Sequence, residues 1–270
     1  LDSDGFTVAV PHQTGGINPS SALCVAWNWK AGTTGSGTTT GSGTGKAYSY
    51  SVNTTAGFSI VKYKGNGTSG HQIPHHLGVS PNFTIIKKTS STEDWIVQNS
   101  VRGWDKRLIL NTNNVEASHT DFISGVSSTT FSLYTNGSVN TNDGDYIAYC
   151  FAEKVGYSSI GSYIGNGDAT NPTFIYTGTK PKFVLVKCTN EADDWFLHDD
   201  KRDGYNDDNE YLRPSLSDAE GTNVNRLSMY SNGFNCPTTD KSHNKSGNTY
   251  IYLAFGQSIV GSNNIPCTAR

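Results

Sequence analysis

The chain has 270 residues, of which 34% are hydrophobic and 16% charged, and its formal net charge is −3 at pH 7. This nearly neutral balance excludes the basic surface that a nucleic-acid binder needs, so we expect no nucleic-acid partner. No stretch approaches the roughly 20 apolar residues of a membrane-spanning helix, so we expect no membrane insertion.

The first 30 residues contain two segments that return later in the chain. Asp4–Phe6 is similar to Asn232–Phe234, and the strand-like Val25–Trp29 is similar to Ile147–Phe151. We interpret residues 1–30 as the last strands of a preceding, partial repeat, in a chain that begins without Met and is expected to be a piece of a longer protein. Two strands are not stable alone in water, so we expect them to pair with a neighbouring unit or another chain.

Residues 31–56 begin with AGTTGSGTTTGSGTG, which contains neither a charge nor a large apolar side chain. This composition is typical of a flexible linker. In a symmetric assembly the same segment would instead be held as an extended strand. We interpret residues 31–56 as a linker or arm, and both alternatives stay open.

From residue 57 onward the chain repeats itself, with a unit of about 100 residues. The motif Tyr63-Lys64-Gly65-Asn66-Gly67 returns 100 positions later as Tyr163-Ile164-Gly165-Asn166-Gly167. Other matching pairs are Pro81 and Pro181, Phe83 and Phe183, Lys87 and Lys187, Trp95 and Trp195, and, after a slip of four residues, Tyr146 and Tyr250. We assign residues 57–155 to repeat 1, residues 156–257 to repeat 2 and residues 258–270 to a C-terminal tail.

Both repeats consist of short runs rich in β-branched and aromatic residues, such as Phe58–Tyr63 and Tyr250–Phe255. Asn-Gly and Asp-Gly pairs between these runs supply the positive φ angles that tight turns require. No stretch keeps a period of 3.6 residues long enough for a convincing helix. The sequence therefore predicts an all-β fold made of tandem β-sandwich domains, one for each repeat.

Three aromatic residues in predicted loops differ between the repeats and are our candidates for ligand binding: Trp104, Tyr205 and Tyr211. An aromatic ring flanked by Asp or Asn suits a neutral sugar, because the CH groups of the sugar stack on the ring and its hydroxyls bond the amides. Trp95 and Trp195 are shared by the two repeats, and we interpret them as core residues.

The acidic segment DDKRDGYNDDNE, residues 199–210, has most of the spacing of a calcium loop. Asp199, Asp203, Asp207 and Glu210 would be the metal ligands. Lys201 places a cation where an oxygen ligand belongs, and no flanking helices are predicted. A solvated loop that distinguishes the two repeats is the alternative, and we expect no other cofactor.

The sequence offers little catalytic chemistry. It contains no G-x-S-x-G motif, and its five cysteines form no C-x-x-C pair, so we interpret the cysteines as thiols, mostly buried. His71, His75 and His76 lie close together and suit either a metal or a polar hairpin rim. We therefore do not expect an enzyme.

Several segments resemble tandem domains of virion structural proteins from tailed phages, notably marine phages and cyanophages. The resemblance covers nearly the whole chain and agrees with the duplication. It implies a location in a virion, as the C-terminal portion of a longer tail fibre or appendage protein, and no catalytic residues carry over from it. Residues 258–270, with Cys267, depart from the aromatic-rich tail that is common in that family. The matching segments are VAWNWKAG (25–32), NTTAGFSIVKYKGNG (53–67), HHLGVSPNFTIIKK (75–88), DYIAYCFAE (145–153), GYSSIGSYIGNG (156–167), SNGFNC (231–236) and TYIYLAFGQ (249–257).

Three functions follow as hypotheses. The first is a tail fibre or appendage adhesin that contacts host surface glycan through variable loops on a repeated scaffold. The second is a purely structural capsid decoration or tail connector protein, and the third is a surface-polysaccharide depolymerase. For the first two we expect partners among the other virion proteins and self-association, with a homotrimer as the expected oligomer.

Overall fold

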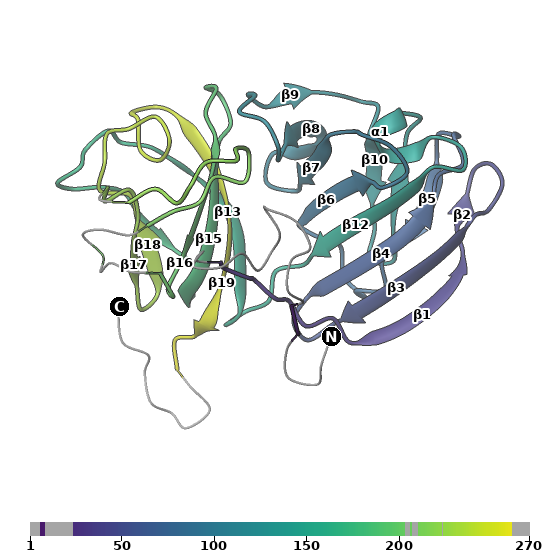
Figure 1. Cartoon of the computed structure of the whole chain (residues 1–270), viewed down its shortest axis with the longest axis horizontal. Helices are drawn as coiled ribbons and strands as arrows, with labels where there is room; N and C mark the ends of the chain where they lie inside the picture. The colour runs from purple at the N-terminus through teal and green to yellow at the C-terminus, as the bar shows by residue number, and fades with distance from the viewer. Residues whose placement is uncertain (1–5, 9–23, 203–205, 207–209, 223, 261–270) are drawn as a thin grey trace. The chain divides into compact units, whose positions relative to one another are not determined.

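A computed structural model describes residues 6–8, 24–202, 206, 210–222 and 224–260 (Figure 1). Residues 1–30 and residues 31–270 form two separate compact units. In the described residues the secondary structure is almost entirely β-strand, and the helix present is the short α1 (Gly137–Asn140). This helix is too short to cross a membrane, and no longer one occurs among those residues. The predicted all-β fold is confirmed.

Repeat 1 and the preceding residues 31–56 together form two antiparallel sheets that enclose one hydrophobic core. The larger sheet has eight strands, in the order β1 (Thr33–Thr38), β3 (Ala47–Asn53), β4 (Phe58–Lys64), β12 (Asp145–Phe151), β6 (Phe83–Lys88), β7 (Trp95–Asn99), β8 (Gly103–Ile109) and β9 (Ala117–Ser118). The smaller sheet has four strands, in the order β10 (Ile123–Val126), β11 (Thr130–Leu133), β5 (His71–Pro74) and β2 (Thr40–Gly41).

Repeat 2 forms the same kind of sandwich with fewer strands (Figure 1). Its larger sheet runs β13 (Ser158–Ile164), β19 (Thr249–Ser258), β15 (Thr179–Cys188) and β16 (Trp195–Asp199), which matches the order β4-β12-β6-β7. Its smaller sheet runs β14 (Phe174–Tyr176), β18 (Gly233–Asn235) and β17 (Ser228–Tyr230), which matches β5-β11-β10. The sequence duplication is thus also a duplication of strand order.

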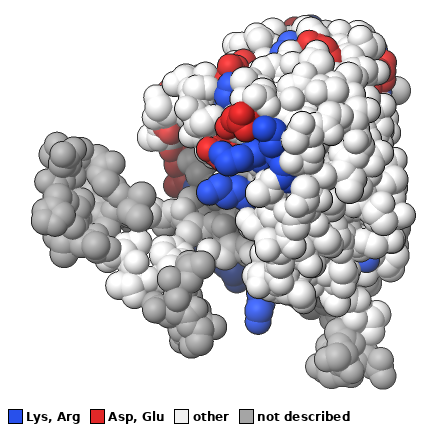
Figure 2. Space-filling view, turned by 90° about the vertical axis from the view of Figure 1, so that its right-hand side faces the viewer, with Lys and Arg blue, Asp and Glu red and all other residues white. Residues whose placement is uncertain are grey.

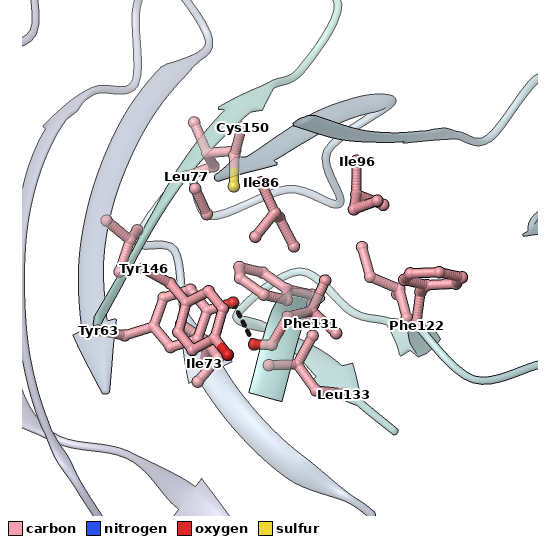
Figure 3. Packing of buried hydrophobic residues seen from close by; sticks show 14 of the residues in the cluster. Tyr63, Ile73, Leu77, Ile86, Ile96, Phe122, Phe131, Leu133, Tyr146 and Cys150 are labelled. Atoms are coloured by element: carbon pink, nitrogen blue, oxygen red, sulfur yellow. Dashed lines mark hydrogen bonds between the residues drawn. The ribbon is translucent and has the colours of Figure 1, made fainter. Parts of the chain in front are cut away.

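A pair of stacked tyrosines in each core explains why these residues recur in the sequence. The rings of Tyr63 and Tyr146 stack at 5.1 Å between centroids, beside Phe131 (Figure 3), and those of Tyr163 and Tyr250 stack at 4.9 Å. Each first tyrosine donates its hydroxyl to a backbone carbonyl across the core, Tyr63 to Val139 at 2.8 Å. The shared tyrosines therefore satisfy their polar ends inside an apolar core, as buried tyrosines require.

Of the two alternatives for residues 31–56, the flexible linker is wrong, because Thr33–Thr38 and Ala47–Asn53 are strands of the larger sheet. β1 pairs with β3 in a continuous antiparallel register from Thr33 opposite Val52 to Thr38 opposite Ala47. Glycines suit this side of β1, because the rings of Tyr50 and Tyr48 lie where side chains of Gly35 and Gly37 would project. The extended-strand alternative is the one observed, although the partner strand belongs to the same chain.

The expected strand Val25–Trp29 is also not observed, since residues 24–30 adopt neither strand nor helix. None of the four sheets of the described chain includes this segment. The matching run Asp4–Phe6 falls mostly outside the described residues, as does most of the C-terminal tail, residues 261–270.

At one equivalent pair of positions, the two repeats have side chains of different size. Val61 on β4 faces Ala148 on β12, whereas the equivalent pair in repeat 2 is Gly161 facing Tyr252. A Cβ added to Gly161 would lie 2.6 Å from the hydroxyl oxygen of Tyr252, so the tyrosine ring occupies the place of the missing side chain. In repeat 2 the missing side chain of Gly161 thus makes room for the larger Tyr252.

Gly161→Val is expected to lower the free energy of unfolding by about 2 kcal/mol, because the new side chain overlaps Tyr252. Adding Tyr252→Ala recreates the pair found in repeat 1, and the double variant is expected to lie within about 1 kcal/mol of the parent. Urea unfolding of the parent, both single variants and the double variant gives the coupling. Additive losses from the two single changes would contradict this account.

Candidate functional site

The outer surface of the small sheet of repeat 2 carries exposed aromatic rings. Because side chains alternate along a strand, Ile175 of β14 points into the core while Phe174 and Tyr176 point outward, 46% and 63% exposed. Tyr230 of β17 and Asn235 of β18 project from the same side, as their strand register requires. We call Phe174, Tyr176, Tyr230 and Asn235 the aromatic face.

The rings of the aromatic face are arranged around a glycine. Tyr176 and Tyr230 both pair with Gly233 from opposite sides, so the middle of that row has no side chain. The ring of Phe174 leans over this gap, and its Cζ lies 2.8 Å from where a Cβ of Gly233 would be. Phe174 and Tyr230 meet edge to face at 5.8 Å between centroids. The result is a partly fixed apolar platform.

Asn235 adds a polar group beside these rings. Its Oδ1 atom is buried, and no hydrogen-bond donor reaches it within the described residues. Such an acceptor costs about 1–3 kcal/mol in the folded protein. This unpartnered amide oxygen lies beside the exposed rings, but it is buried, so a ligand hydroxyl reaches it only when the Asn235 side chain turns outward.

The same sheet face in repeat 1 has a different chemistry. Gln72 and Pro74 of β5 stand where Phe174 and Tyr176 stand in repeat 2. This face is hollowed into an open groove of about 510 Å³. Its lining side chains are uncharged and mostly carry hydroxyls: Thr40, Gln72, Val126, Ser127, Thr129, Thr130 and Ser132, together with Gly125. Two equivalent faces have thus diverged, which is typical of surfaces that bind rather than support the fold.

Trp104 lies on β8 rather than in a loop. Its half-buried ring packs against the core of repeat 1 and borders a small pocket of about 90 Å³, together with Asp105, His119 and Tyr134. Its backbone carbonyl accepts a hydrogen bond from Gln98. The expected combination of an aromatic ring and a carboxylate is present, in a pocket much smaller than the repeat 1 groove.

Tyr211 is not available as a sugar platform, and that assignment is corrected. The side chain is 9% exposed. Its ring contacts Phe196 at 5.2 Å between centroids, and the guanidinium of Arg226 lies 5.2 Å from its centroid. Arg226 bonds Asp240 at 2.8 Å, which holds the cation over the ring. The ring of this loop tyrosine is therefore buried between Phe196 and Arg226, with which it makes a cation–π contact.

Tyr205 lies outside the described residues, but its neighbour Asn206 is described. The amide of Asn206 donates to the carbonyl of Met229 at 2.8 Å and accepts from its N–H at 3.0 Å. Asn206 is thus held on the edge of β17, the strand that carries Tyr230 of the aromatic face.

Half of the predicted calcium ligands can be examined. Asp203 and Asp207 lie outside the described residues. The carboxylate of Asp199 is 5% exposed and accepts from the backbone of Lys201 and from Nε of Arg202, both at 3.0 Å. Arg202 therefore neutralises Asp199. Across the residues that the structure describes, no group of three or more His, Cys, Asp or Glu is placed to hold a metal.

The three neighbouring histidines each have a separate structural partner. His71 bonds Asn140 and Thr39, His75 bonds the carbonyl of Ser127, and His76 bonds the hydroxyl of Tyr48 while stacking on Tyr50 at 3.6 Å. The three histidines therefore support the fold through separate hydrogen bonds, and His71 and His75 are fully buried rather than on a hairpin rim. Three of the cysteines, Cys150, Cys188 and Cys236, are buried thiols, and Cys24 is exposed.

Sequence reasoning missed the aromatic face. A signal was present, because aligning the repeats replaces Gln72 and Pro74 by Phe174 and Tyr176 on either side of a shared isoleucine. A strand with apolar residues on both faces, in one repeat and not in the other, indicates an exposed apolar surface. The missing hydrogen-bond partner of the Asn235 amide oxygen could not be predicted from the sequence, because it depends on which atoms surround that side chain.

Comparisons with known proteins give one match. A family model described as a domain of unknown function (DUF7483) matches residues 1–258. No curated protein and no solved structure matches the chain.

Proposed function

We propose that this chain, which belongs to the DUF7483 family, binds neutral glycan through the aromatic face. The observation that supports this proposal is the pair of exposed rings, Phe174 and Tyr176, beside Asn235, whose amide oxygen has no hydrogen-bond partner in the described chain. Aromatic rings stack on the CH faces of sugars, and an amide accepts from sugar hydroxyls.

The biological setting that we propose is a phage virion, with the protein acting as a tail fibre or appendage adhesin on host surface glycan. This part rests on the resemblance of segments such as residues 53–67 and 156–167 to virion proteins of tailed phages. The four side chains of the aromatic face carry no charge, which favours a neutral ligand over an acidic one. The proposed role is binding, without a catalytic step.

Tyr176→Ala is expected to weaken binding to the glycan about tenfold, because a well-placed stacking contact contributes roughly 1.4 kcal/mol. Asn235→Ala is expected to weaken binding as well while leaving the protein as stable or more stable, because the amide oxygen has no partner to lose in the folded chain. A glycan array selects the ligand from host envelope sugars, and titration calorimetry then compares the variants.

The matched control is Ile164→Ala, since Ile164 on β13 is 63% exposed, as Tyr176 is, and lies outside the aromatic face. Its affinity is expected to equal that of the parent. Binding by Tyr176→Ala as tight as that of the parent would move the site elsewhere, with the pocket beside Trp104 as the next to test. A parent protein that binds no host glycan would overturn the proposal.

A further inference from the structure

The eight-stranded sheet ends in an edge strand, β1, that has small side chains and is mostly exposed. β1 is outermost in the sheet, and its partner is β3. Five of its six residues are exposed, and Gly35 is half-buried. Among the described residues, no hydrogen bond reaches the backbone groups on its outer side. A row of N–H and C=O groups therefore faces outward from this edge.

Sheet edges of this kind are normally protected by charged residues, proline, bulges or short length. Other edges in this chain have such protection: β9 has two residues, and β10 carries a register shift between Ile123 and Gly125. β13 is also an edge strand, but Ser158–Ile160 at its start are buried. β1 has a regular register and contains neither a charge nor a proline.

The sequence of β1 is complementary to itself. Thr34-Gly35-Ser36-Gly37-Thr38 reads the same in both directions. In an antiparallel pair of two such strands, centred on Ser36, each glycine faces a glycine and each threonine faces a threonine. Cross-strand threonine pairs are favourable, and the small residues leave room for close approach. A pair of this kind has two-fold symmetry, which is the commonest symmetry of protein dimers.

The side chains around β1 also suit a second copy. Tyr50 and Tyr48 lie against Gly35 and Gly37 on one side of the strand, so that an added strand would extend an aromatic surface that already exists. Figure 2 shows the molecule from the side on which Figure 1 draws β1 and β2. Most of the surface in this view carries no charged side chains. No charge repulsion from the strand itself opposes an identical partner.

We propose that β1 is a self-association surface, on which two copies of this chain pair their β1 strands antiparallel about a two-fold axis through Ser36. The two eight-stranded sheets then form one continuous sheet across the dimer. This inference is independent of glycan binding, because the aromatic face belongs to the other repeat.

The test uses Ser36→Lys, which places two lysines opposite each other at the proposed axis. Ser36 is exposed, and its side chain makes no hydrogen bond within the described chain, so the monomer is expected to keep its fold. Analytical ultracentrifugation of the full chain is expected to show a dimer for the parent and at least a tenfold weaker association for Ser36→Lys at low salt. Ser162→Lys is the matched control, since Ser162 is an exposed serine on the edge strand β13, and it is expected to stay dimeric.

Charge complementation gives a second readout. Ser36→Glu alone is expected to be as weakly associated as Ser36→Lys, and mixing the two variants is expected to restore the dimer, because opposite charges then meet at the axis. A monomeric parent, a trimer, or a parent-like mass for Ser36→Lys would each overturn the proposal. Failure of the mixture to associate would also count against pairing at Ser36.

Discussion

Lowering the pH from 7 to 5 is expected to destabilise repeat 2 by at least about 2 kcal/mol, through the buried pair His198 and His243. The two Nε2 atoms lie 3.0 Å apart, and both rings are fully buried. One ring must donate and the other accept, so the pair is stable when both are neutral. The Nδ1 of His243 lies 2.7 Å from the hydroxyl of Ser242, which holds that ring in place.

Burial lowers the pKa of His198 to about 3, helped by the positive charges of Arg226 and Arg202 and opposed by Asp199. Burial and the neighbouring His198 hold the pKa of His243 well below its usual range, and Arg226 acts in the same direction. In the unfolded chain both histidines titrate near 6.5. Their contribution to stability is therefore complete above that pH and is lost as the pH falls toward the folded pKa values.

The magnitude follows from the linkage. Between pH 6.5 and pH 5 the unfolded chain binds a proton at His198 that the folded chain does not, which costs about 1.4 kcal/mol for each pH unit, or about 2 kcal/mol at pH 5. His243 adds a loss of the same sign over this interval. The measurement is urea unfolding from pH 7 to pH 5, followed by tryptophan fluorescence, to which Trp195, 1% exposed, contributes the signal of repeat 2.

The control comes from the chain itself, because repeat 1 has Gln98 and Val139 at the equivalent positions. A double variant with His198→Gln and His243→Val is expected to lose much less stability on acidification. His75, whose pKa burial lowers to about 4, titrates in both proteins and cancels in the comparison. An equal slope in the parent and the double variant would refute the role of the pair.

Asn140→Ala is expected to lower the free energy of unfolding by about 4 kcal/mol. The side chain is fully buried and makes four hydrogen bonds. Its Oδ1 accepts from the backbone of Asn66 at 2.9 Å and bonds His71 at 3.0 Å, and its Nδ2 donates to two carbonyls. Alanine would leave these buried groups without partners, each at a cost of roughly 1 kcal/mol or more.

Urea unfolding also measures this effect, with Asn142→Ala as the control. Asn142 lies two positions away, is exposed and bonds the exposed Asp143, so its loss is expected to stay within about 0.5 kcal/mol. Asn244→Ala tests the equivalent site in repeat 2, where the amide oxygen accepts from the backbone of Asn166 at 2.9 Å. If Asn140→Ala were no more harmful than Asn142→Ala, the buried amide would not support the fold.

The recurring Gly-Asn-Gly motif illustrates how far the sequence leads. Its repetition at residues 65–67 and 165–167 revealed the duplication and a turn in each copy. The reason for the repetition is tertiary, because Gly65 passes so close to the carbonyl of Thr141 that a Cβ would meet it at 2.3 Å, and Asn66 is bonded by Asn140. The partners are more than 70 residues away in the chain, beyond any local signal.

The sequence by itself determined the duplication and the all-β class, because strand alternation, turn residues and internal matches are local properties of the chain. The tertiary structure alone decided that residues 31–56 extend a sheet, that Tyr211 is buried under Arg226 and that Phe174 and Tyr176 face outward beside Asn235. Composition cannot distinguish a linker from an edge strand, since glycine and threonine suit both. The difference depends on whether a partner strand and its aromatic rings are present, and only the folded chain brings them together.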